Sequence, residues 1–463
     1  MKKSLTIAVA LIASLTIAVP PSSSETLSPL SSQLEVTVKT MNGTIRNPKV
    51  FPLANGSSFV TWQEESTDGY YLKARTVSAT NKLGTIRTLS VGKAALLDGS
   101  EGVQDTVAIN RSGKLFAVWV TPGTRYNVPS HTVWGRTSAD GSSWSKPLVV
   151  IPGLSLTGDP EDCEMEPTNT PSCGFLRLQA AIDDKGRLAV LVADSIQSTG
   201  PRYRVKASSF VGKWGNFKTL SEVPQLRGSE ILGLTSGFMV SATKYSSGST
   251  NSVKTSYYDP KAEAWTSTST PISINANTVI NAHWVQRDTK NLTLATASSN
   301  VSGGIAIRNY NVDSKSWTSA LVSIQDREPD LVYQDLRAAK VGSALVVMFN
   351  TYNQGAGTSE VRVSKVIGLT PTNVVVGTAT EQLDLLYAGA SITGEAVIAY
   401  NHISEGTKLG GITPSTLPSS LPNTAASAYL SAMTKTKADK VYGVGLKFGE
   451  GTTAVVLTQG YVR

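Results

Sequence analysis

The stretch Asn110-Arg-Ser-Gly113, followed at once by Leu115-Phe-Ala-Val-Trp119, decides the fold of this 463-residue chain. Its plan is a polar turn that leads directly into a short and nearly continuous apolar segment. The clearest second copy is Asp183-Asp-Lys-Gly186 before Leu188-Ala-Val-Leu-Val192. Further copies of the turn begin at Asn55, Ser236, Thr289, Gly342, Gly394 and Ala438. The pattern therefore repeats through most of the chain, at a spacing of about 50 residues.

Strands and turns that repeat at this spacing are typical of small sheets closed into a ring, the β-propeller. The segment after each turn is apolar at successive positions, so we expect it to lie buried between neighbouring sheets. Segments such as Val133-Trp-Gly-Arg-Thr137 alternate in polarity and predict strands with one wet face. The sequence therefore predicts an all-β protein, a single β-propeller of about eight four-stranded blades. Seven blades is the alternative, if the last two copies merge.

The two ends of such a ring have to meet, because an open ring leaves unpaired strand edges. The last copy has three clear strands, Ala428–Thr434, Val441–Phe448 and Thr453–Tyr461, and lacks a fourth. The segment Leu34-Glu-Val-Thr-Val-Lys39 alternates like a strand but precedes the first copy. We expect this N-terminal strand to close the ring as the outer strand of the last blade.

The N-terminus predicts export. Two lysines precede an apolar stretch from Leu5 to Val19, which is typical of a secretory signal peptide at residues 1–19. An uncleaved membrane anchor is the alternative, although the stretch is short for a span. Residues 20–33 form a flexible leader rich in Pro and Ser, and residues 34–463 form the propeller domain. No second long apolar run follows, so the mature chain is expected to have no membrane span and to be a secreted, extracellular monomer.

Composition excludes some classes of function. Apolar residues make up 40% of the chain and charged residues 16%, which excludes global disorder. The formal net charge is +8, but no cluster of Lys and Arg follows the pattern that tracks a nucleic-acid backbone. We therefore expect no nucleic-acid partner. Weak attraction to an anionic envelope or polysaccharide remains open.

An insertion at residues 153–175 breaks the repeat and contains both cysteines of the chain. Export favours a disulfide between Cys163 and Cys173. Five carboxylates of the same insertion could hold a hard cation such as calcium through oxygen ligands, although their spacing matches no EF-hand. These are Asp159, Glu161, Asp162, Glu164 and Glu166. The alternative is a solvated acidic loop, and no other cofactor is expected.

Three turns combine an acid with a Trp that follows it. They are Ser138-Ala-Asp140-Gly141-Ser-Ser-Trp144, Asp259 to Trp265, and Asp313 to Trp317. An Asp side chain can accept backbone N–H bonds within a turn, and a Trp ring can fill the space between blades.

The first of these turns resembles the Asp-box of sialidase-like bacterial propellers, roughly Ser-x-Asp-x-Gly-x-Thr-Trp. Ser138, Asp140, Gly141 and Trp144 match, while Ser143 stands in place of Thr and one residue is missing. The resemblance implies a structural turn away from the ligand, so a structural role is expected for Asp140. Sialidases also use three arginines, a Tyr–Glu pair and an Asp, and Arg46-Asn47-Pro48 is loosely similar to their early Arg motif.

Spacing assigns no catalytic set. Arg227, Arg287, Arg308, Arg327 and Arg337 cannot be sorted into a triad from the sequence. The residues expected at a ligand-binding rim are Arg46, Asp326, Arg327, Glu328 and Asp330. The three histidines, His131, His283 and His402, fall in different repeats, and His283 is expected to be a core residue.

Two functions follow from these observations. The first is an exported, non-catalytic propeller that binds or scaffolds a glycan or protein at or outside the cell envelope. The second is a glycan-active hydrolase or lyase on the same fold, because a fold does not determine an activity. The absence of a recognisable catalytic set in the sequence favours the first.

Overall fold

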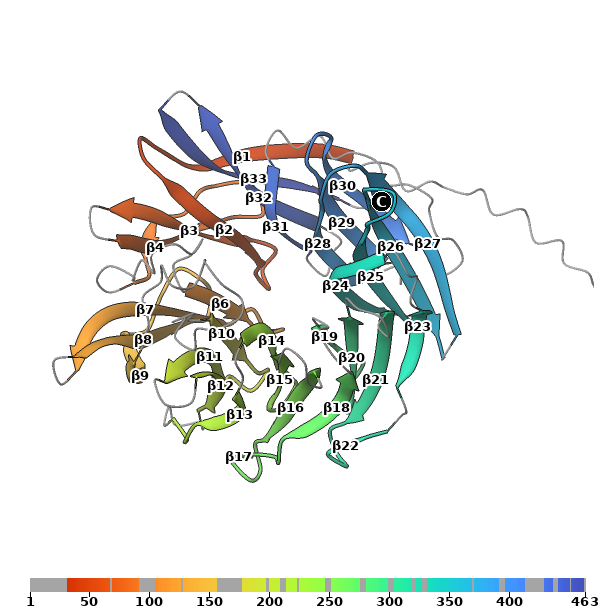
Figure 1. The fold of residues 1–463 in the computed structure, drawn as a ribbon. Helices are drawn as coiled ribbons and strands as arrows, with labels where there is room; N and C mark the ends of the chain where they lie inside the picture. The colour runs from red at the N-terminus through yellow and green to blue at the C-terminus, as the bar shows by residue number, and fades with distance from the viewer. Residues whose placement is uncertain are drawn as a thin grey trace, which may run out of the picture.

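The computed structural model describes residues 31–66, 69–90, 105–125, 128–155, 177–196, 200–208, 214–222, 225–245, 251–274, 280–298, 304–318, 321–326, 331–368, 370–390, 396–412, 429–435, 440–449 and 451–461. Figure 1 shows eight antiparallel sheets arranged around a central axis, so the chain forms one eight-bladed β-propeller. No helix occurs in these ranges. The predicted all-β ring of eight blades is confirmed, and the alternative of seven blades is wrong.

The blades follow one another along the chain. Blade 1 contains β2 (Ile45–Pro52), β3 (Ser58–Ser66), β4 (Gly69–Val77) and β5 (Arg87–Thr88). Blade 2 contains β6 (Asp105–Ile109), β7 (Leu115–Arg125), β8 (Val128–Ser138) and β9 (Leu148–Ser155). Blade 3 contains β10 (Arg177–Ile182), β11 (Leu188–Ile196), β12 (Gly200–Ala207) and β13 (Lys218–Glu222). Blade 4 contains β14 (Gln225–Gly233), β15 (Phe238–Tyr245), β16 (Asn251–Asp259), β17 (Ala264–Trp265) and β18 (Ser269–Ile274).

The second half of the ring repeats this plan. Blade 5 contains β19 (Ile280–Gln286), β20 (Asn291–Ser298), β21 (Gly304–Asn311), β22 (Ser316–Trp317) and β23 (Val322–Asp326). Blade 6 contains β24 (Leu331–Val341), β25 (Ala344–Asn353), β26 (Thr358–Ile367) and β27 (Thr370–Ala379). Blade 7 contains β28 (Leu383–Ala390), β29 (Ala396–His402) and β30 (Gly406–Ile412). Blade 8 contains β31 (Tyr429–Lys435), β32 (Lys440–Gly449), β33 (Thr452–Tyr461) and β1 (Ser31–Met41).

The N-terminal strand closes the ring. β1 pairs with β33 in an antiparallel ladder in which Val36 opposes Leu457. The last blade therefore takes its three inner strands from the C-terminus and its outer strand from the N-terminus, as the sequence predicts. This arrangement covers the edge of β33 that would otherwise be open.

The second strand of each blade forms the core of the ring. In β25, eight consecutive residues from Ala344 to Thr351 are buried, and β20 is buried from Leu292 to Ser298. The side chains of these strands pack between blades, for example Ala295 of β20 with Val347 of β25. Complete burial of a Val, Leu or Phe side chain stabilises the fold by about 1.5–3 kcal/mol. The continuous apolar runs in the sequence follow from burial on both faces.

Arginine side chains of the third strands join neighbouring blades at the perimeter of the ring. Nη1 of Arg75 in β4 donates to the carbonyl of Val38 in β1, at 2.6 Å. Nη1 of Arg136 in β8 donates to the carbonyl of Leu89 in blade 1, at 3.4 Å. Arg308 of β21 makes the same kind of bond to Pro271 in blade 4, at 2.5 Å. Several basic residues of this chain therefore serve to link blades.

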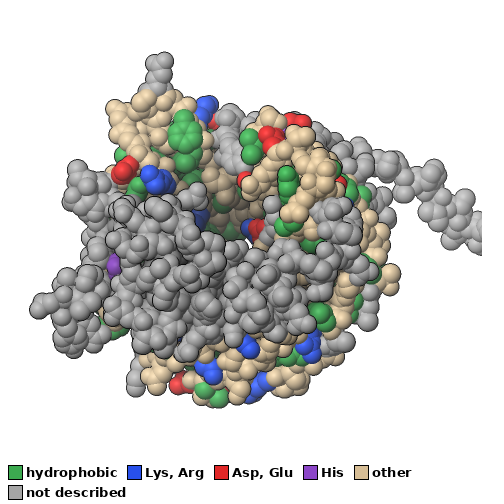
Figure 2. All heavy atoms as spheres, viewed as in Figure 1, with side chains coloured by type: hydrophobic (Ala, Val, Ile, Leu, Met, Phe, Trp, Pro, Cys, Tyr) green, Lys and Arg blue, Asp and Glu red, His purple; other side chains and the backbone are tan. Residues whose placement is uncertain are grey.

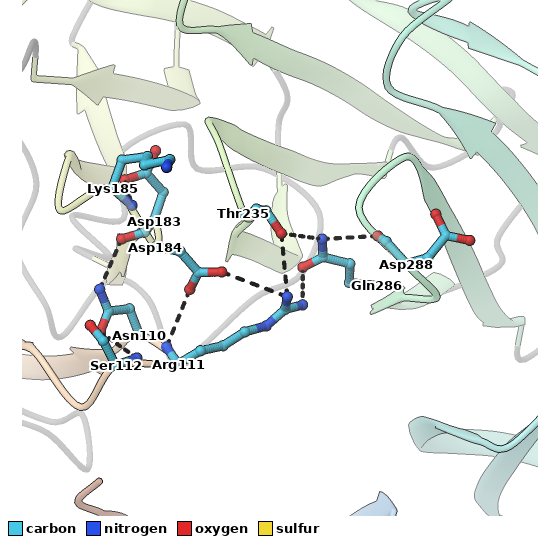
Figure 3. Close-up of polar contacts among 9 residues, drawn as sticks. All are labelled: Asn110, Arg111, Ser112, Asp183, Asp184, Lys185, Thr235, Gln286 and Asp288. Carbon is cyan, nitrogen blue, oxygen red and sulfur yellow. Dashed lines mark hydrogen bonds and ion pairs between the residues drawn. The ribbon is translucent and has the colours of Figure 1, made fainter.

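The turns between the first and second strands of the blades lie at one end of the ring, which we call the first-turn face. Figure 3 shows how Arg111 crosses it. Its guanidinium donates to Oγ1 of Thr235 in blade 4, at 3.3 Å, and to Oε1 of Gln286 in blade 5, at 2.5 Å. It also pairs with Asp184 in blade 3, at 3.6 Å. One side chain from blade 2 thus contacts the turns of blades 3 and 4 and the end of β19 in blade 5.

Candidate axial site

The first strands of the blades surround the axis, and one register position in them lines up around the ring. This position lies three residues before the last paired residue of each first strand, as Glu230 does before Gly233. We call the resulting ring the axial belt. Its members are Lys49, Thr106, Gln179, Glu230, His283, Ala338, Tyr387 and Ala432. Five of these eight residues are polar, and Tyr387 adds a phenol to a ring that is otherwise completed by two alanines.

Belt side chains reach from one first strand to the next. Nζ of Lys49 contacts Oδ1 and the carbonyl oxygen of Asp105 in blade 2, both at 3.2 Å. Nε2 of Gln179 donates to the carbonyl of Ser229 in blade 4, at 2.7 Å. These bonds hold the innermost strands together where space for apolar packing is limited. Figure 2 shows Lys, Arg, Asp and Glu side chains at the hollow near the middle of the ring.

Glu230 and His283 form the one acid–histidine contact within the belt among the described residues. Nδ1 of His283 lies 3.1 Å from Oε1 of Glu230, and Oε2 of Glu230 accepts the backbone N–H of Trp284 at 2.8 Å. The side chains of His283 and Glu230 are 28% and 22% exposed, so solvent reaches both. No residue in the described ranges is bonded to Nε2 of His283. The carboxylate thus orients the imidazole and leaves one ring nitrogen available.

The charges around His283 set its protonation. Burial alone would lower the pKa of His283, but the charge of Glu230 and its hydrogen bond outweigh burial, so the pKa is raised above its ordinary value. Arg337 of β24 opposes this effect and Asp335 of the same strand reinforces it. The raised pKa makes His283 a stronger base than a free imidazole.

Asp335 and Arg337 form an ion pair on β24. Nη1 of Arg337 donates to Oδ2 of Asp335 at 2.8 Å and to the carbonyl of Leu336 at 2.9 Å. Oδ1 of Asp335 accepts the backbone N–H of Leu336 at 2.8 Å. The side chain of Arg337 is 36% exposed and that of Asp335 is 42% exposed. Within the described residues, Nη2 and Nε of Arg337 have no partner, so the guanidinium keeps donors for a ligand.

Bulges interrupt five of the first strands toward the end that lies opposite the first-turn face. The register shifts fall between Arg46 and Lys49, Arg227 and Ser229, Tyr333 and Leu336, Leu385 and Tyr387, and Leu430 and Ala432. A bulge bends its strand and changes the direction of nearby side chains, and bulges are frequent beside active sites. Arg46, Arg227 and Asp335 all lie at these bulges, on blades 1, 4 and 6.

The rim residues predicted from the sequence are only partly described. Arg46 is exposed, and its guanidinium lies 5.4 Å from the centre of the Tyr70 ring. The neighbouring Asn47 has a φ of 48°, in the left-handed region, which marks the bulge. Asp326 is the last residue of β23, and its side chain is not described. Arg327, Glu328 and Asp330 lie outside the described residues.

The predicted disulfide and cation site also lie outside the described residues. Cys163 and Cys173 are in residues 156–176, as are Asp159, Glu161, Asp162, Glu164 and Glu166. In the part of the chain that the structure describes, no group of three His, Cys, Asp or Glu residues is placed to hold a metal ion. Nor do the described ranges contain a helix with the length and apolar character to cross a membrane.

The Asp-box-like turn at Asp140 is held by its own side chains. Oδ1 of Asp140 accepts the backbone N–H groups of Ser142 and Ser143, each at 2.9 Å. Oγ of Ser138 accepts the N–H of Gly141 at 2.8 Å, and Nε1 of Trp144 donates to the carbonyl of Gly141 at 3.1 Å. The hydrogen bond from the Ser142 hydroxyl and those from the backbone lower the pKa of Asp140 to about 2.

The other two turns use different groups. Oδ1 of Asp259 accepts the N–H of Lys261 at 2.9 Å, and its other oxygen pairs with Lys315 of blade 5. Asp313 pairs with Lys290 at 2.7 Å, whereas Oδ1 of Asn311 accepts the N–H of Ser314 in that turn. The tryptophan rings of these turns pack against other aromatic rings. The ring centroids of Trp144 and Phe59 of blade 1 are 5.6 Å apart. The corresponding distances are 5.3 Å for Trp265 and Tyr258, and 5.8 Å for Trp317 and Trp284.

A second cluster of titratable groups lies between blades 6 and 7. Oε1 of Glu381 accepts from the backbone N–H and hydroxyl of Ser404 at 2.9 and 2.7 Å, and lies 2.6 Å from Nδ1 of His402. Oγ of Ser404 lies 3.3 Å from the same Nδ1. A Ser nucleophile and its orienting acid need opposite nitrogens of the imidazole, and here both share one. The cluster therefore anchors a turn and does not activate Ser404.

Sequence reasoning did not identify Glu230 or Asp335, and it placed His283 in the core. One signal would have found the belt. Counting three residues back from the end of each first strand aligns Lys49, Glu230 and His283 at one level of the ring. That count depends on knowing where each first strand ends, which the turn positions supply only approximately.

Comparison with known proteins gives structures and no sequence relatives. No family model and no curated protein matches the chain. A polysaccharide lyase is similar with a TM-score of 0.48 and 10% identity, over 94% of this chain and 100% of that one. The sialidase NanB from Streptococcus pneumoniae is similar with a TM-score of 0.39 and 12% identity, over 84% of this chain and 71% of the sialidase. An α-L-arabinofuranosidase from Fusarium graminearum is similar with a TM-score of 0.37 and 12% identity, over 62% of this chain and 92% of the arabinofuranosidase. These neighbours are glycan-active enzymes, and at these identities the likeness concerns the fold alone.

Proposed function

We propose that this propeller is a glycan-active enzyme whose reaction takes place at the axial belt. The observation that carries the proposal is the Glu230–His283 pair, in which a carboxylate holds one imidazole nitrogen and leaves the other available. An acid–base group of this kind, beside the guanidinium of Arg337, is what cleavage of an acidic glycan requires.

The hydrogen-bond partners of the two carboxylates favour a lyase over a hydrolase. A glycoside hydrolase needs one protonated carboxylic acid and one carboxylate. Glu230 accepts bonds from Trp284 and His283, and Asp335 accepts bonds from Leu336 and Arg337. Both carboxylates are thus already engaged as hydrogen-bond acceptors. Within the described residues, the axial site therefore offers an imidazole base and a guanidinium, and both carboxylates are bonded as acceptors.

In the proposed β-elimination, Arg337 binds the carboxylate of a uronic acid residue. Nε2 of His283 removes the proton from the carbon beside that carboxylate. The electron pair forms a carbon–carbon double bond, the bond between the next carbon and the glycosidic oxygen breaks, and that oxygen takes up a proton from water. Glu230 stabilises the imidazolium that forms. The substrate class is thus a polysaccharide that contains uronic acids.

The first test is turnover of a panel of glycans. Polygalacturonate, hyaluronan and heparin carry uronic acids, sialyllactose carries a different acidic sugar, and arabinan is a neutral control. We expect ultraviolet absorbance from the new double bond with a uronate polymer and none with arabinan. Release of reducing ends without that absorbance would instead support a hydrolase. Retention of the protein on a glycan without any product would support the non-catalytic binding propeller.

The second test assigns the residues. His283→Gln and Arg337→Lys should each lower kcat/KM about 10²- to 10⁴-fold, the usual contribution of an acid–base group or a positioned cation. Lys408→Gln, which removes an ion pair with Glu405 on blade 7, is the control and should leave the rate unchanged. If His283→Gln retains the full rate, the assignment of the base is wrong.

The third test is the pH profile. His283 has to be neutral to act as a base, so the rate should rise with pH through its raised pKa. Glu230→Gln removes the charge that raises this pKa, so the acid limb should move to lower pH while the maximal rate falls. An acid limb that stays in place would contradict a role for the pair.

We also propose export of the chain, from the signal peptide expected at residues 1–19. The disulfide between Cys163 and Cys173 is part of the same proposal. Intact mass of the protein from the culture medium measures both. Two free thiols, or a chain that retains its first residues, would contradict it.

A further inference from the structure

Three second strands carry a buried amide side chain where the neighbouring first strand has its bulge. They are Gln63, Asn350 and Asn401, which are at most 3% exposed. Each amide nitrogen donates to the first strand of the following blade. Gln63 binds Oδ2 of Asp105 at 3.1 Å, and Asn350 and Asn401 bind the carbonyls of Leu383 and Leu430 at 2.8 Å. Linking neighbouring blades is therefore common to all three.

The amide oxygens differ in what they accept. That of Asn350 accepts the backbone N–H of Asp335 at 2.7 Å, within the bulge of β24. That of Asn401 accepts the hydroxyl of Thr407 at 2.7 Å, within its own blade. That of Gln63 accepts the side chain of Asn47 at 3.1 Å. The bond of Asn350 thus goes to the backbone of a residue whose charged side chain acts on His283.

A bulge leaves a backbone N–H without its partner in the ladder, and the strand can then take more than one path. Asn350 supplies the missing acceptor for Asp335. Because Asp335 in turn bonds Leu336 and Arg337, the path of the bulge determines where both charges lie. β24 contacts β19, the strand that carries His283.

We propose that Asn350 is a positioning residue of the axial site, which fixes the bulge of β24 and thereby holds Asp335 and Arg337 at the edge next to β19. Its bond to Leu383 connects this arrangement to blade 7. The catalytic meaning of the proposal rests on the proposed function, but the placement of the charges does not.

The placement is tested by NMR titration of the histidine side chains. The chain has only three histidines, so a protein labelled in histidine gives three resolvable curves, and His283→Gln assigns one of them. Glu230 on β14 and the pair Asp335–Arg337 on β24 are the charged groups that act on His283. Asn350→Leu should shift the midpoint of His283, because it displaces Arg337, which lowers that midpoint, together with Asp335, which raises it.

Asn401→Leu is the matched control, since it removes an equivalent link between blades and leaves β24 intact. It should destabilise the ring to a similar degree and leave the His283 curve unchanged. An unchanged His283 curve in Asn350→Leu, or an equal change in Asn401→Leu, would overturn the proposal. If Asn350→Leu does not fold, Asn350→Ser, which also loses the acceptor for Asp335, gives the same comparison.

Turnover separates this inference from the proposed function. On the uronate polymer that the enzyme cleaves, Asn350→Leu should lower kcat/KM about 10- to 100-fold, because it displaces the guanidinium that binds the substrate carboxylate. Asn401→Leu should stay within about 2-fold once the folded fraction is taken into account. Full activity in Asn350→Leu with inactive His283→Gln would refute the positioning role alone. Full activity in His283→Gln and Arg337→Lys would refute the proposed function, and the titration would still decide the placement.

Discussion

At the scale of single residues, Asp140 illustrates how one carboxylate can hold a turn. It accepts two backbone N–H bonds and the hydroxyl of Ser142. Because the side chain is exposed, water competes for these bonds and their net value stays low. We expect Asp140→Asn to cost about 1 kcal/mol of unfolding free energy at pH 7. Urea denaturation measures this, and Asp313→Asn, which loses only an exposed ion pair, should change the stability little.

The same substitution predicts a dependence on pH. The pKa of Asp140 is about 2 in the folded protein, against about 3.9 in an unfolded chain. A lowered pKa gives stability that is present above the unfolded value and is lost as the pH falls toward the folded value. The difference between the parent and Asp140→Asn should thus persist down to pH 4 and disappear near pH 2. If the difference in unfolding free energy stays constant across that range, the loss of stability comes from the shape of the side chain and not from its charge.

The contrast between Asp140 and Glu230 explains which residues a sequence can identify. The role of Asp140 depends on Ser138 to Ser143, all within one turn, so local chemistry predicts it. The role of Glu230 depends on His283 and on charges of β24, which are more than 50 and 100 residues away. Their meeting depends on the register of three first strands, and the repeat predicts that register only to within a few residues.

At the scale of elements, the turns explain why glycines stand where they do. Gly141 has a φ of 77°, and an added Cβ would lie 2.8 Å from Cδ2 of Phe59. Gly342 has a φ of 57°, but nothing lies within 4 Å of its added Cβ. Gly342→Ala should therefore cost about 1 kcal/mol, from backbone strain alone. Gly141→Ala should cost about 2–4 kcal/mol, since it adds a steric clash to a similar strain.

Thermal unfolding of the two glycine variants checks this prediction. Both changes add one methyl group in a turn between strands, so they differ only in what surrounds the new atom. Equal stabilities would mean that Phe59 can move aside and that the turn does not pack closely between blades 1 and 2.

The elements also show which parts of the fold local sequence predicts. The second strands were predicted because burial on both faces produces an unbroken apolar run, as in Leu115 to Val120. The first strands are harder to read, because their bulges disturb the alternation of side chains. In β24, the bulge between Tyr333 and Leu336 shifts the pattern where Asp335 enters the site. The residues that matter for the site are thus those at which the periodic signal fails.

At the scale of the whole molecule, the positive net charge has a partly structural origin. Arg75, Arg136 and Arg308 donate to carbonyls of the preceding blade, and Lys206 does so to Val150 at 3.4 Å. Burial lowers the pKa of Arg136 and of Lys206, which shows that these cations lie within the perimeter contacts. A charge of +8 is consequently a poor guide to the ligand. His283 and Arg337 at the axis give better evidence, because within the described part of the chain each keeps nitrogen atoms without a partner.

Closure of the ring is the feature on which the whole molecule depends. β1 covers the edge of β33, and its Val38 is fully buried against the cluster that contains Trp62 and Leu457. A chain that begins at Asn42 should lose this strand and expose the edge of β33. The loss of several buried side chains, each worth about 1.5–3 kcal/mol, is a large part of the 5–15 kcal/mol that stabilises a typical domain. We expect a much lower melting temperature and aggregation through the open edge.

A chain that begins at Ser31 is the matched control, because it retains all of β1. It should melt like the full chain. A peptide that spans Ser31–Met41, added to the shorter chain, should pair with β33 and restore part of the melting temperature, since an exposed edge binds a matching strand in trans. A scrambled peptide of the same composition should not. If the shorter chain has the same melting temperature as the control and remains monomeric, contacts between blades hold the ring and the N-terminal strand is not needed.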